Sequence, residues 1–154
     1  NMATRLAVAD SVGVDAIVVA VAGLERLGLG HRIDEVIASD IMVPQVAQGA
    51  LAVECRVDDE VTAGLLGSID NASLRMLVEL ERSWLRELGS GCDLPVGGLA
   101  RQTADHIEMD VFLSNPAGTS VLRHRASADT PDGVLAQCVD VVLERGRGRE
   151  LLVR

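Results

Sequence analysis

The clearest periodic pattern in the chain lies between residues 70 and 88, where apolar side chains recur every three or four positions. This spacing places the apolar side chains on one face of a helix and predicts that this face is buried. Asp70 or Asn71 can cap the beginning of the helix, and Gly89 occupies the position expected for a left-handed C-terminal cap. The apolar stripe consists of Leu74, Leu77, Val78, Trp84, Leu85 and Leu88.

Three stretches of alternating apolar and polar residues follow this helix, and each has the period of a β-strand. A turn over residues 115–118 joins the second stretch to the third and predicts a hairpin. The predicted strands span residues 94–101, 106–114 and 119–126.

A second amphipathic helix is predicted after these strands. Thr130 can cap it with its hydroxyl, and Pro131 is compatible with its first turn. Its apolar stripe, which includes Cys138, is expected to face inward, and the helix ends near Gly146. Residues 70–154 are therefore predicted to form a small α+β domain, in which helices cover a three-stranded antiparallel sheet.

The first part of the chain has a different pattern. Residues 14–22 are almost all apolar and rich in Val and Ile, which is typical of a parallel strand buried on both faces. The tail of a helix over residues 1–12 precedes this strand, and short helices are expected over residues 24–29 and 32–38. A strand followed by helices is the repeating element of an α/β fold. Residues 1–44 are therefore assigned to part of an α/β domain.

Residues 41–48 are predicted to form a connection that crosses between structural units. Pro44 and Gly49, which bracket this segment, are typical of such a connection. Gln48, Gly49 and Ala50 place an amide side chain beside accessible backbone N–H groups. This neutral donor set suits a carboxylate.

A strand and a short helix are expected to follow. Residues 51–56 alternate, and Cys55 shares their apolar side, so Cys55 is predicted to be a small core residue. A helix is predicted over residues 58–68, with Asp58 and Asp59 favourable at its beginning. Its inward side chains are predicted to be Val61, Leu65 and Leu66.

The residues after the first helix combine features of a reactive site. Cys92 follows Gly89 and Gly91, and flanking glycine lets the backbone pass close to a bulky ligand. Pro95 favours extended backbone before it and so discourages a return to helix. A cysteine on such a loop is badly placed for core packing and well placed for covalent chemistry.

The composition of the chain excludes several classes of binding partner and site. The net charge is −9, with 23 acidic residues against 14 arginines and no lysine, which argues against nucleic acid or an anionic membrane surface. No apolar run approaches the length of a membrane span, and no signal peptide is recognised. Three widely spaced cysteines predict neither a disulfide framework nor a metal site. A protein of the reducing cytoplasm is the simplest interpretation.

Two motifs around Cys92 resemble the porphobilinogen deaminases, also called hydroxymethylbilane synthases. They are Glu-Arg-x-x-Leu-x-x-Leu over residues 81–88 and Gly-Cys-x-x-Pro-x-Gly over residues 91–97. The segment 43–56 is similar to the family's Leu-Pro-x-Val-Gly-Gln-Gly-Ala-x-Gly-Ile-Glu, with Ala47 where the family usually has glycine. Asn-x-x-Thr-Arg-Leu over residues 1–6 resembles a helix of the family. These matches keep their order and spacing over most of the chain.

The resemblance implies that this chain is the C-terminal half of a longer, three-domain enzyme. Residues 1–44 then belong to the second domain, which has a periplasmic-binding-protein-like α/β fold. Residues 45–69 supply a crossing connection and a strand to the first domain, and residues 70–154 form the C-terminal α+β domain. The family's catalytic aspartate has no counterpart in this sequence.

The resemblance also implies a transferase of porphyrin and haem biosynthesis, which joins four porphobilinogen units into hydroxymethylbilane and releases ammonia. Cys92 is expected to hold a dipyrromethane cofactor through a thioether. Arg5 is expected to pair with carboxylates of the cofactor or growing chain, because guanidinium binds carboxylates bidentately. Gln48, Gly49 and Ala50 are expected to contribute to cofactor binding. The expected form is a monomer, or a complex with the N-terminal half, without a metal.

Two other classes of protein remain open on the residues alone. The first is a non-catalytic module that binds a pyrrole or another small acid, since the catalytic aspartate is absent. The second is a small thiol redox protein, against which the absence of a Cys-x-x-Cys pair weighs. The bare polypeptide mass would indicate the binding module. Thiol titration that shows a single cysteine of low pKa cycling through disulfide exchange would indicate the redox protein.

Overall fold

The structure of the chain is a computed structural model that describes residues 2–11, 13–89 and 94–152. It consists of two compact units, Asn1–Ala38 and Ser39–Arg154, which are described separately. In these described ranges, no helix is long and apolar enough to cross a membrane.

The larger unit is built on an antiparallel sheet. Its strands are β1 (Val96–Gln102), β2 (Ile107–Ser114) and β3 (Val121–Ala128), in the spatial order β1-β2-β3. Each strand begins and ends close to the stretch that predicts it, so the prediction of three strands is confirmed. In the turn between β2 and β3, the Asn115 side chain accepts a hydrogen bond from the Ser120 backbone N–H at 3.0 Å.

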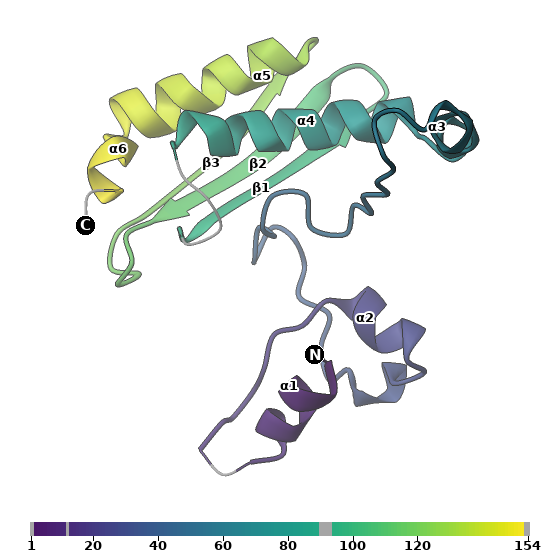
Figure 1. The fold of residues 1–154 in the computed structure, drawn as a ribbon. Helices are drawn as coiled ribbons and strands as arrows, with labels where there is room; N and C mark the ends of the chain where they lie inside the picture. Colours follow the sequence, from purple (N-terminus) through teal and green to yellow (C-terminus); the bar gives the residue numbers. More distant parts are fainter. Residues whose placement is uncertain (1, 12, 90–93, 153–154) are drawn as a thin grey trace. The chain divides into compact units, whose positions relative to one another are not determined.

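Helices cover one face of this sheet (Figure 1). α4 (Ala72–Glu87) packs against β1, and Asn71 caps it by accepting a hydrogen bond from the Leu74 N–H. α5 (Pro131–Cys138) packs against β3 and α4, and Thr130 caps it as predicted. The helix continues as a π-helical segment, η2 (Val139–Arg145), and α6 (Gly148–Leu151) follows. The two long predicted helices and the α+β character are therefore confirmed.

The core lies between these helices and the sheet. Every second side chain of β2 faces it, and these side chains are at most 3% exposed. Trp84 of α4 and Cys138 of α5 are completely buried, as their places in the apolar stripes predict. Burial raises the pKa of the Cys138 thiol to about 12, so this cysteine is unreactive at neutral pH. The inward residues of β2 are Ile107, Met109, Val111 and Leu113.

The smaller unit departs from the prediction. Its described residues form α1 (Met2–Ala9), α2 (Val21–Arg26) and the 3₁₀ helix η1 (Gly30–Arg32). The strand predicted over residues 14–22 does not form, and neither does the helix predicted over residues 32–38. An extended segment becomes a strand only when a neighbouring strand pairs with its backbone, and the described residues of this unit include none. The periplasmic-binding-protein-like fold is therefore not confirmed.

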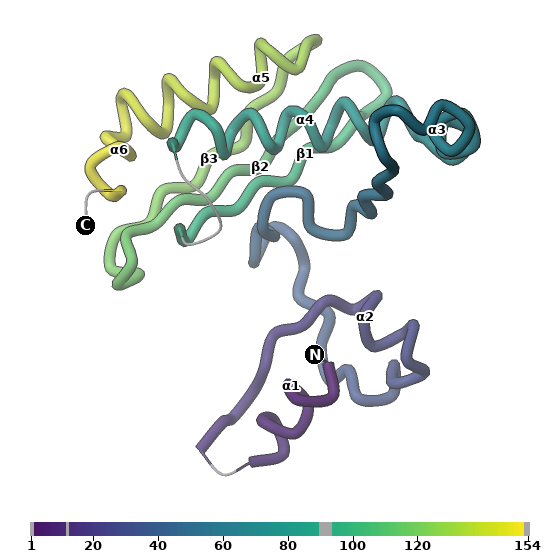
Figure 2. The backbone as a smooth tube through the Cα atoms, viewed as in Figure 1, coloured from purple at the N-terminus to yellow at the C-terminus, as the bar shows by residue number. Residues whose placement is uncertain are grey.

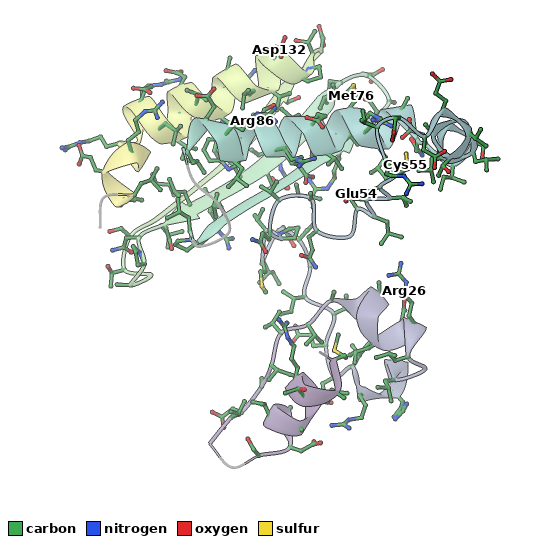
Figure 3. All side chains as sticks on the ribbon, viewed as in Figure 1. Arg26, Glu54, Cys55, Met76, Arg86 and Asp132 are labelled. Atoms are coloured by element: carbon green, nitrogen blue, oxygen red, sulfur yellow. The ribbon has the colours of Figure 1, made fainter. Side chains whose placement is uncertain are left out.

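The segment before α4 differs in a similar way. Residues 51–56 form no strand, and Cys55 is exposed, so the prediction of a core cysteine is wrong (Figure 3). α3 (Glu60–Gly67) forms where predicted, with Asp59 as its cap. However, Val61 and Leu65 are 77% and 69% exposed instead of buried. An apolar stripe is buried only where another element covers it, and no described element covers this one.

Candidate functional site

Residues 39–50, which we call the crossing segment, reach the edge of β1 at Pro44 (Figure 2). The Gly98 backbone N–H donates a hydrogen bond to the Pro44 carbonyl at 3.0 Å. A Cβ atom on Gly97 would lie 2.8 Å from the Val43 carbonyl oxygen and 2.9 Å from that of Pro44, which is too close for any side chain. The glycine of the Pro-x-Gly motif therefore allows the crossing segment to approach β1.

Glu81 joins the crossing segment to α4 and β1. This residue lies on the buried face of α4 and is 5% exposed. Its Oε2 atom accepts a hydrogen bond from the Ala47 N–H at 2.7 Å, and its Oε1 atom accepts one from the Ala100 N–H at 2.8 Å. Burial raises the pKa of the Glu81 carboxyl, and these two hydrogen bonds offset the effect only in part. One carboxylate thus binds backbone groups of two segments that are distant in sequence.

The loop at the end of the crossing segment uses most of its own backbone donors. The Gln48 N–H donates to the Gln45 carbonyl at 3.0 Å, and the Ala50 N–H donates to the Ala47 carbonyl at 3.2 Å. The donor set at residues 48–50 is therefore smaller than the sequence predicts. Within the part of the chain that the structure describes, the Gly49 N–H and the exposed side-chain amide of Gln48 have no hydrogen-bond partner and are the groups left for a ligand.

Ala47 has a φ of 59°, a left-handed conformation that costs a residue with a Cβ atom about 1–2 kcal/mol. We expect Ala47→Gly to raise the free energy of unfolding of the larger unit by about 0.5–1 kcal/mol, because relief of strain exceeds the entropy that glycine adds to the unfolded chain. Urea unfolding followed by the fluorescence of Trp84, the single tryptophan, measures this change. Ala52→Gly, in the exposed segment without a positive φ, is the control and should lower stability slightly. A loss of stability in Ala47→Gly would contradict the strain.

The sheet face opposite the helices carries an ion network centred on Asp110, which is 7% exposed. Arg101 donates to the Asp110 carboxylate at 2.6 Å, and Arg125 donates two hydrogen bonds to it at 2.6 and 3.1 Å. Arg101 also donates to the Ser39 hydroxyl at 2.9 Å, which fixes the beginning of the crossing segment. Burial alone would raise the pKa of Asp110, but the hydrogen bonds from the two arginines outweigh it and lower this pKa below its usual value.

Arg123 fixes the next part of the crossing segment. Its guanidinium donates hydrogen bonds to the carbonyl oxygens of Asp40 and Ile41, at 3.2 and 2.6 Å. It also lies 5.5 Å from the centre of the Phe112 ring, within the range of a cation–π interaction. The crossing segment is thus held near its beginning by Arg101 and Arg123 of the sheet, and near its end by Glu81 of α4.

Cys92, the predicted attachment site, lies outside the described residues, within residues 90–93. The residues on either side are described. α4 ends just before Gly89, which has a φ of 65° and confirms the predicted cap. Leu94 packs against the core immediately before β1. Along the chain, Cys92 therefore connects the two elements that Glu81 holds together.

Arg5 lies on α1 in the smaller unit. It lines a cavity of about 300 Å³ together with Val8, Ile17 and Val18. A guanidinium beside aliphatic side chains suits a ligand with an apolar body and a carboxylate. Within the described residues, Arg5 forms no ion pair, so its charge is available to such a ligand.

Sequence reasoning misses Glu81 and Asp110. Glu81 gives one usable signal, because it follows Leu77 by four positions and precedes Trp84 by three, so it lies on the buried stripe of α4. A buried carboxylate requires hydrogen-bond donors. The donors to Glu81 are backbone N–H groups, which have no sequence signature, and only the fold identifies them.

Comparison with known proteins gives one family. A family model described as "Porphobilinogen deaminase, dipyromethane cofactor binding domain" matches residues 1–64, and one described as "Porphobilinogen deaminase, C-terminal domain" matches residues 75–143. The porphobilinogen deaminases of Roseiflexus sp. (strain RS-1) and Desulforudis audaxviator (strain MP104C) are each 39% identical to this chain, over 153 and 156 residues. These alignments cover 99% and 100% of this chain and 50% of each relative. The chain thus spans about half the length of the curated relatives it matches.

Proposed function

This chain belongs to the porphobilinogen deaminase family, and we propose that it is the C-terminal half of an enzyme that joins four porphobilinogen molecules into hydroxymethylbilane with release of ammonia. The observation that carries this proposal is the meeting of two family motifs. Residues 43–56 and residues 81–97 contact each other through Glu81 and Gly97. Two motifs that are separate in the sequence thus form one structural junction.

The proposal extends to the domain organisation. Residues 1–44 belong to a second, periplasmic-binding-protein-like domain, residues 45–69 contribute a connection and a strand to a first domain, and residues 70–154 form the C-terminal domain. This division accounts for the apolar residues that the described structure leaves exposed in residues 51–69. In the whole enzyme, other segments would cover them.

The donors of the chain fit a dipyrromethane cofactor. The pyrrole rings of this cofactor carry acetate and propionate groups, which require N–H donors. The Gly49 N–H, the Gln48 amide and the Arg5 guanidinium are such donors, and none of them has a carboxylate partner within the described residues. We propose that Gln48 and Gly49 bind cofactor carboxylates, with Ala50 closing the turn that presents them, and that Arg5 binds a carboxylate of the cofactor or the growing chain.

Cys92 is proposed as the covalent anchor. Its sulfur would hold the cofactor through a C–S bond to a pyrrole methylene carbon; the C–N bond of that carbon would break, and the amino group, with the proton given up by the thiol, would leave as ammonia. A soft thiolate is a good nucleophile for this carbon, and the thioether product resists hydrolysis. The bound cofactor primes chain growth, so that each addition is effectively intramolecular. Proton transfer to the substrate is assigned to the remainder of the enzyme.

The mass of the intact protein tests this proposal. The 154-residue chain has a mass of 16.3 kDa, and the full-length protein purified under native conditions should exceed its own polypeptide mass by two pyrrole units. Peptide mapping should place the added mass on Cys92. A bare polypeptide mass would favour the non-catalytic binding module. Native mass spectrometry of the same sample also tests the proposed monomeric state.

Arg5→Leu should weaken the binding of the cofactor or growing chain by about 2 kcal/mol, because it removes a charge-assisted hydrogen bond to a carboxylate. In the full-length enzyme, this loss should raise the Michaelis constant or lower the turnover number. Arg26→Leu, a change of the same kind on α2, is the control and should have little effect. Unchanged kinetics in Arg5→Leu would remove the proposed role of this arginine.

A further inference from the structure

Glu81 presents an unusual combination of burial and partners. Its carboxylate is buried, yet within the described residues no arginine or histidine forms an ion pair with it. Its hydrogen-bond partners are the backbone N–H groups of Ala47 and Ala100. A buried carboxylate without a cation is costly compared with an apolar side chain. Core packing alone therefore does not explain an acidic residue here.

The geometry requires both oxygens of the side-chain terminus to accept a hydrogen bond. The Ala47 and Ala100 N–H groups donate to different oxygens of the same carboxylate. Glutamine has the same shape but only one acceptor, and its NH₂ group would face one of the two N–H donors. Glutamate is thus chemically specific for this junction.

The hydrogen bond from Ala47 acts on a loop that is conformationally strained. Ala47 is held at a φ of 59°, and its carbonyl accepts the hydrogen bond from Ala50 that closes the turn around Gly49. Without the contact to Glu81, the loop would gain from a relaxation of Ala47 out of the left-handed region. Such relaxation would move the Gly49 N–H and the Gln48 amide.

We propose that Glu81 is a positioning residue: it fixes Ala47 against β1 and thereby holds Gln48 and Gly49 in place to receive a carboxylate of the ligand. The identity of that ligand as dipyrromethane rests on the proposed function, whereas the positioning of the loop does not. Glu81 itself donates no hydrogen bond to the ligand and takes no part in the chemistry. It holds the loop beside α4 and β1, the two elements that Cys92 connects along the chain.

Amide hydrogen exchange of the unaltered protein gives the first test. The Ala47 N–H lies in an irregular loop, but its bond to a buried carboxylate should make it exchange as slowly as the Ala100 N–H in β1. The neighbouring Gly49 N–H should exchange fast. If Ala47 exchanges as fast as Gly49, the proposal is wrong. This measurement needs no substitution and does not depend on the activity of the enzyme.

Glu81→Gln gives the second test, with Glu79→Gln as the matched control, because Glu79 lies on the exposed side of the same helix. In Glu81→Gln, exchange at Ala47 should accelerate at least about tenfold, while Val111 and Leu113 in the core remain protected. Equal acceleration at the Ala47, Val111 and Leu113 amides would show a general loss of stability and overturn the positioning role. In the full-length protein, Glu81→Gln should also lower the fraction of molecules that carry pyrrole units, and Glu79→Gln should not.

The two proposals can fail independently. If the unaltered full-length protein carries no pyrrole units, the proposed function fails, and the exchange rates of Ala47 still decide the role of Glu81. If Glu81→Gln retains full cofactor loading and slow exchange at Ala47, the positioning role fails, and the anchor role of Cys92 is unaffected.

Discussion

Cys92→Ser in the full-length protein should abolish the covalent attachment of pyrrole units, so that the measured mass equals that of the bare polypeptide. A serine hydroxyl has a far higher pKa than a thiol and remains protonated, so it does not compete as a nucleophile for the methylene carbon. Enzymatic activity should be lost with the adduct, because the proposed reaction begins from the bound cofactor. Intact mass spectrometry and a product assay on the same sample measure both effects.

The other two cysteines provide matched controls for this experiment. Cys55 has an exposed thiol, and Cys138 has a buried one whose pKa burial raises to about 12. Cys55→Ser should therefore retain the full adduct, which shows that exposure of a thiol is not sufficient for attachment. Cys138→Ser should also retain it if the protein folds. An adduct that persists in Cys92→Ser, or disappears in Cys55→Ser, would refute the assignment of the anchor.

Asp110→Asn should lower the free energy of unfolding of the larger unit by about 3 kcal/mol, because Arg101 and Arg125 lose the buried carboxylate that they share. The asparagine side chain also places an NH₂ group where one carboxylate oxygen accepts a hydrogen bond from an arginine, so that two donors face each other. Both arginines remain partly exposed, so the effect falls at the lower end of the range for broken buried ion pairs. Urea unfolding followed by Trp84 fluorescence measures the loss. Asp70→Asn breaks the exposed ion pair with Arg75 and should cost less than about 1 kcal/mol.

The effect of Asp110→Asn should depend on pH. The folded protein lowers the pKa of Asp110 below 3.8, so the unfolded chain takes up this proton first as the pH falls. The stability that Asp110 contributes is therefore present above about pH 4 and is lost as the pH falls through the lowered pKa. The difference between the unaltered protein and Asp110→Asn should shrink from about pH 7 to about pH 3. Glu81, whose pKa burial raises, acts in the opposite sense but is present in both proteins. A constant difference would show that Asp110 does not act through its charge.

The sequence predicted the C-terminal α+β domain well. Helix α4, the three strands and α5 lie where periodicity and capping residues place them, because these signals are local. Asn71 and Thr130 cap the helices from adjacent positions, and the alternation along β2 selects which of its side chains enter the core. In this part of the chain, each element finds its partner within the same domain, so local signals and tertiary packing agree.

The predictions that failed depend on partners that the pattern does not supply. Among the residues that the structure describes, none forms a strand that pairs with residues 14–22, although these have the composition of a buried strand, and none covers Cys55. The binding role predicted for residues 48–50 stays a prediction, but it has fewer donors than the residue types suggested. The backbone N–H groups of Gln48 and Ala50 donate to carbonyl groups within the turn. The periodicity of a segment indicates which side chains it can bury. It does not indicate which backbone groups already form hydrogen bonds within the fold.

The sequence by itself determined the family, the position of Cys92 between a helix and a strand, and the architecture of the C-terminal domain. Only the tertiary structure showed that Glu81 binds Ala47 and Ala100, that Gly97 admits the crossing segment, and that Asp110 is shared by two arginines. The physical reason is that these contacts join backbone groups or residues far apart in sequence. Backbone N–H and C=O groups are the same at every non-proline position, so their pairing is decided by the fold.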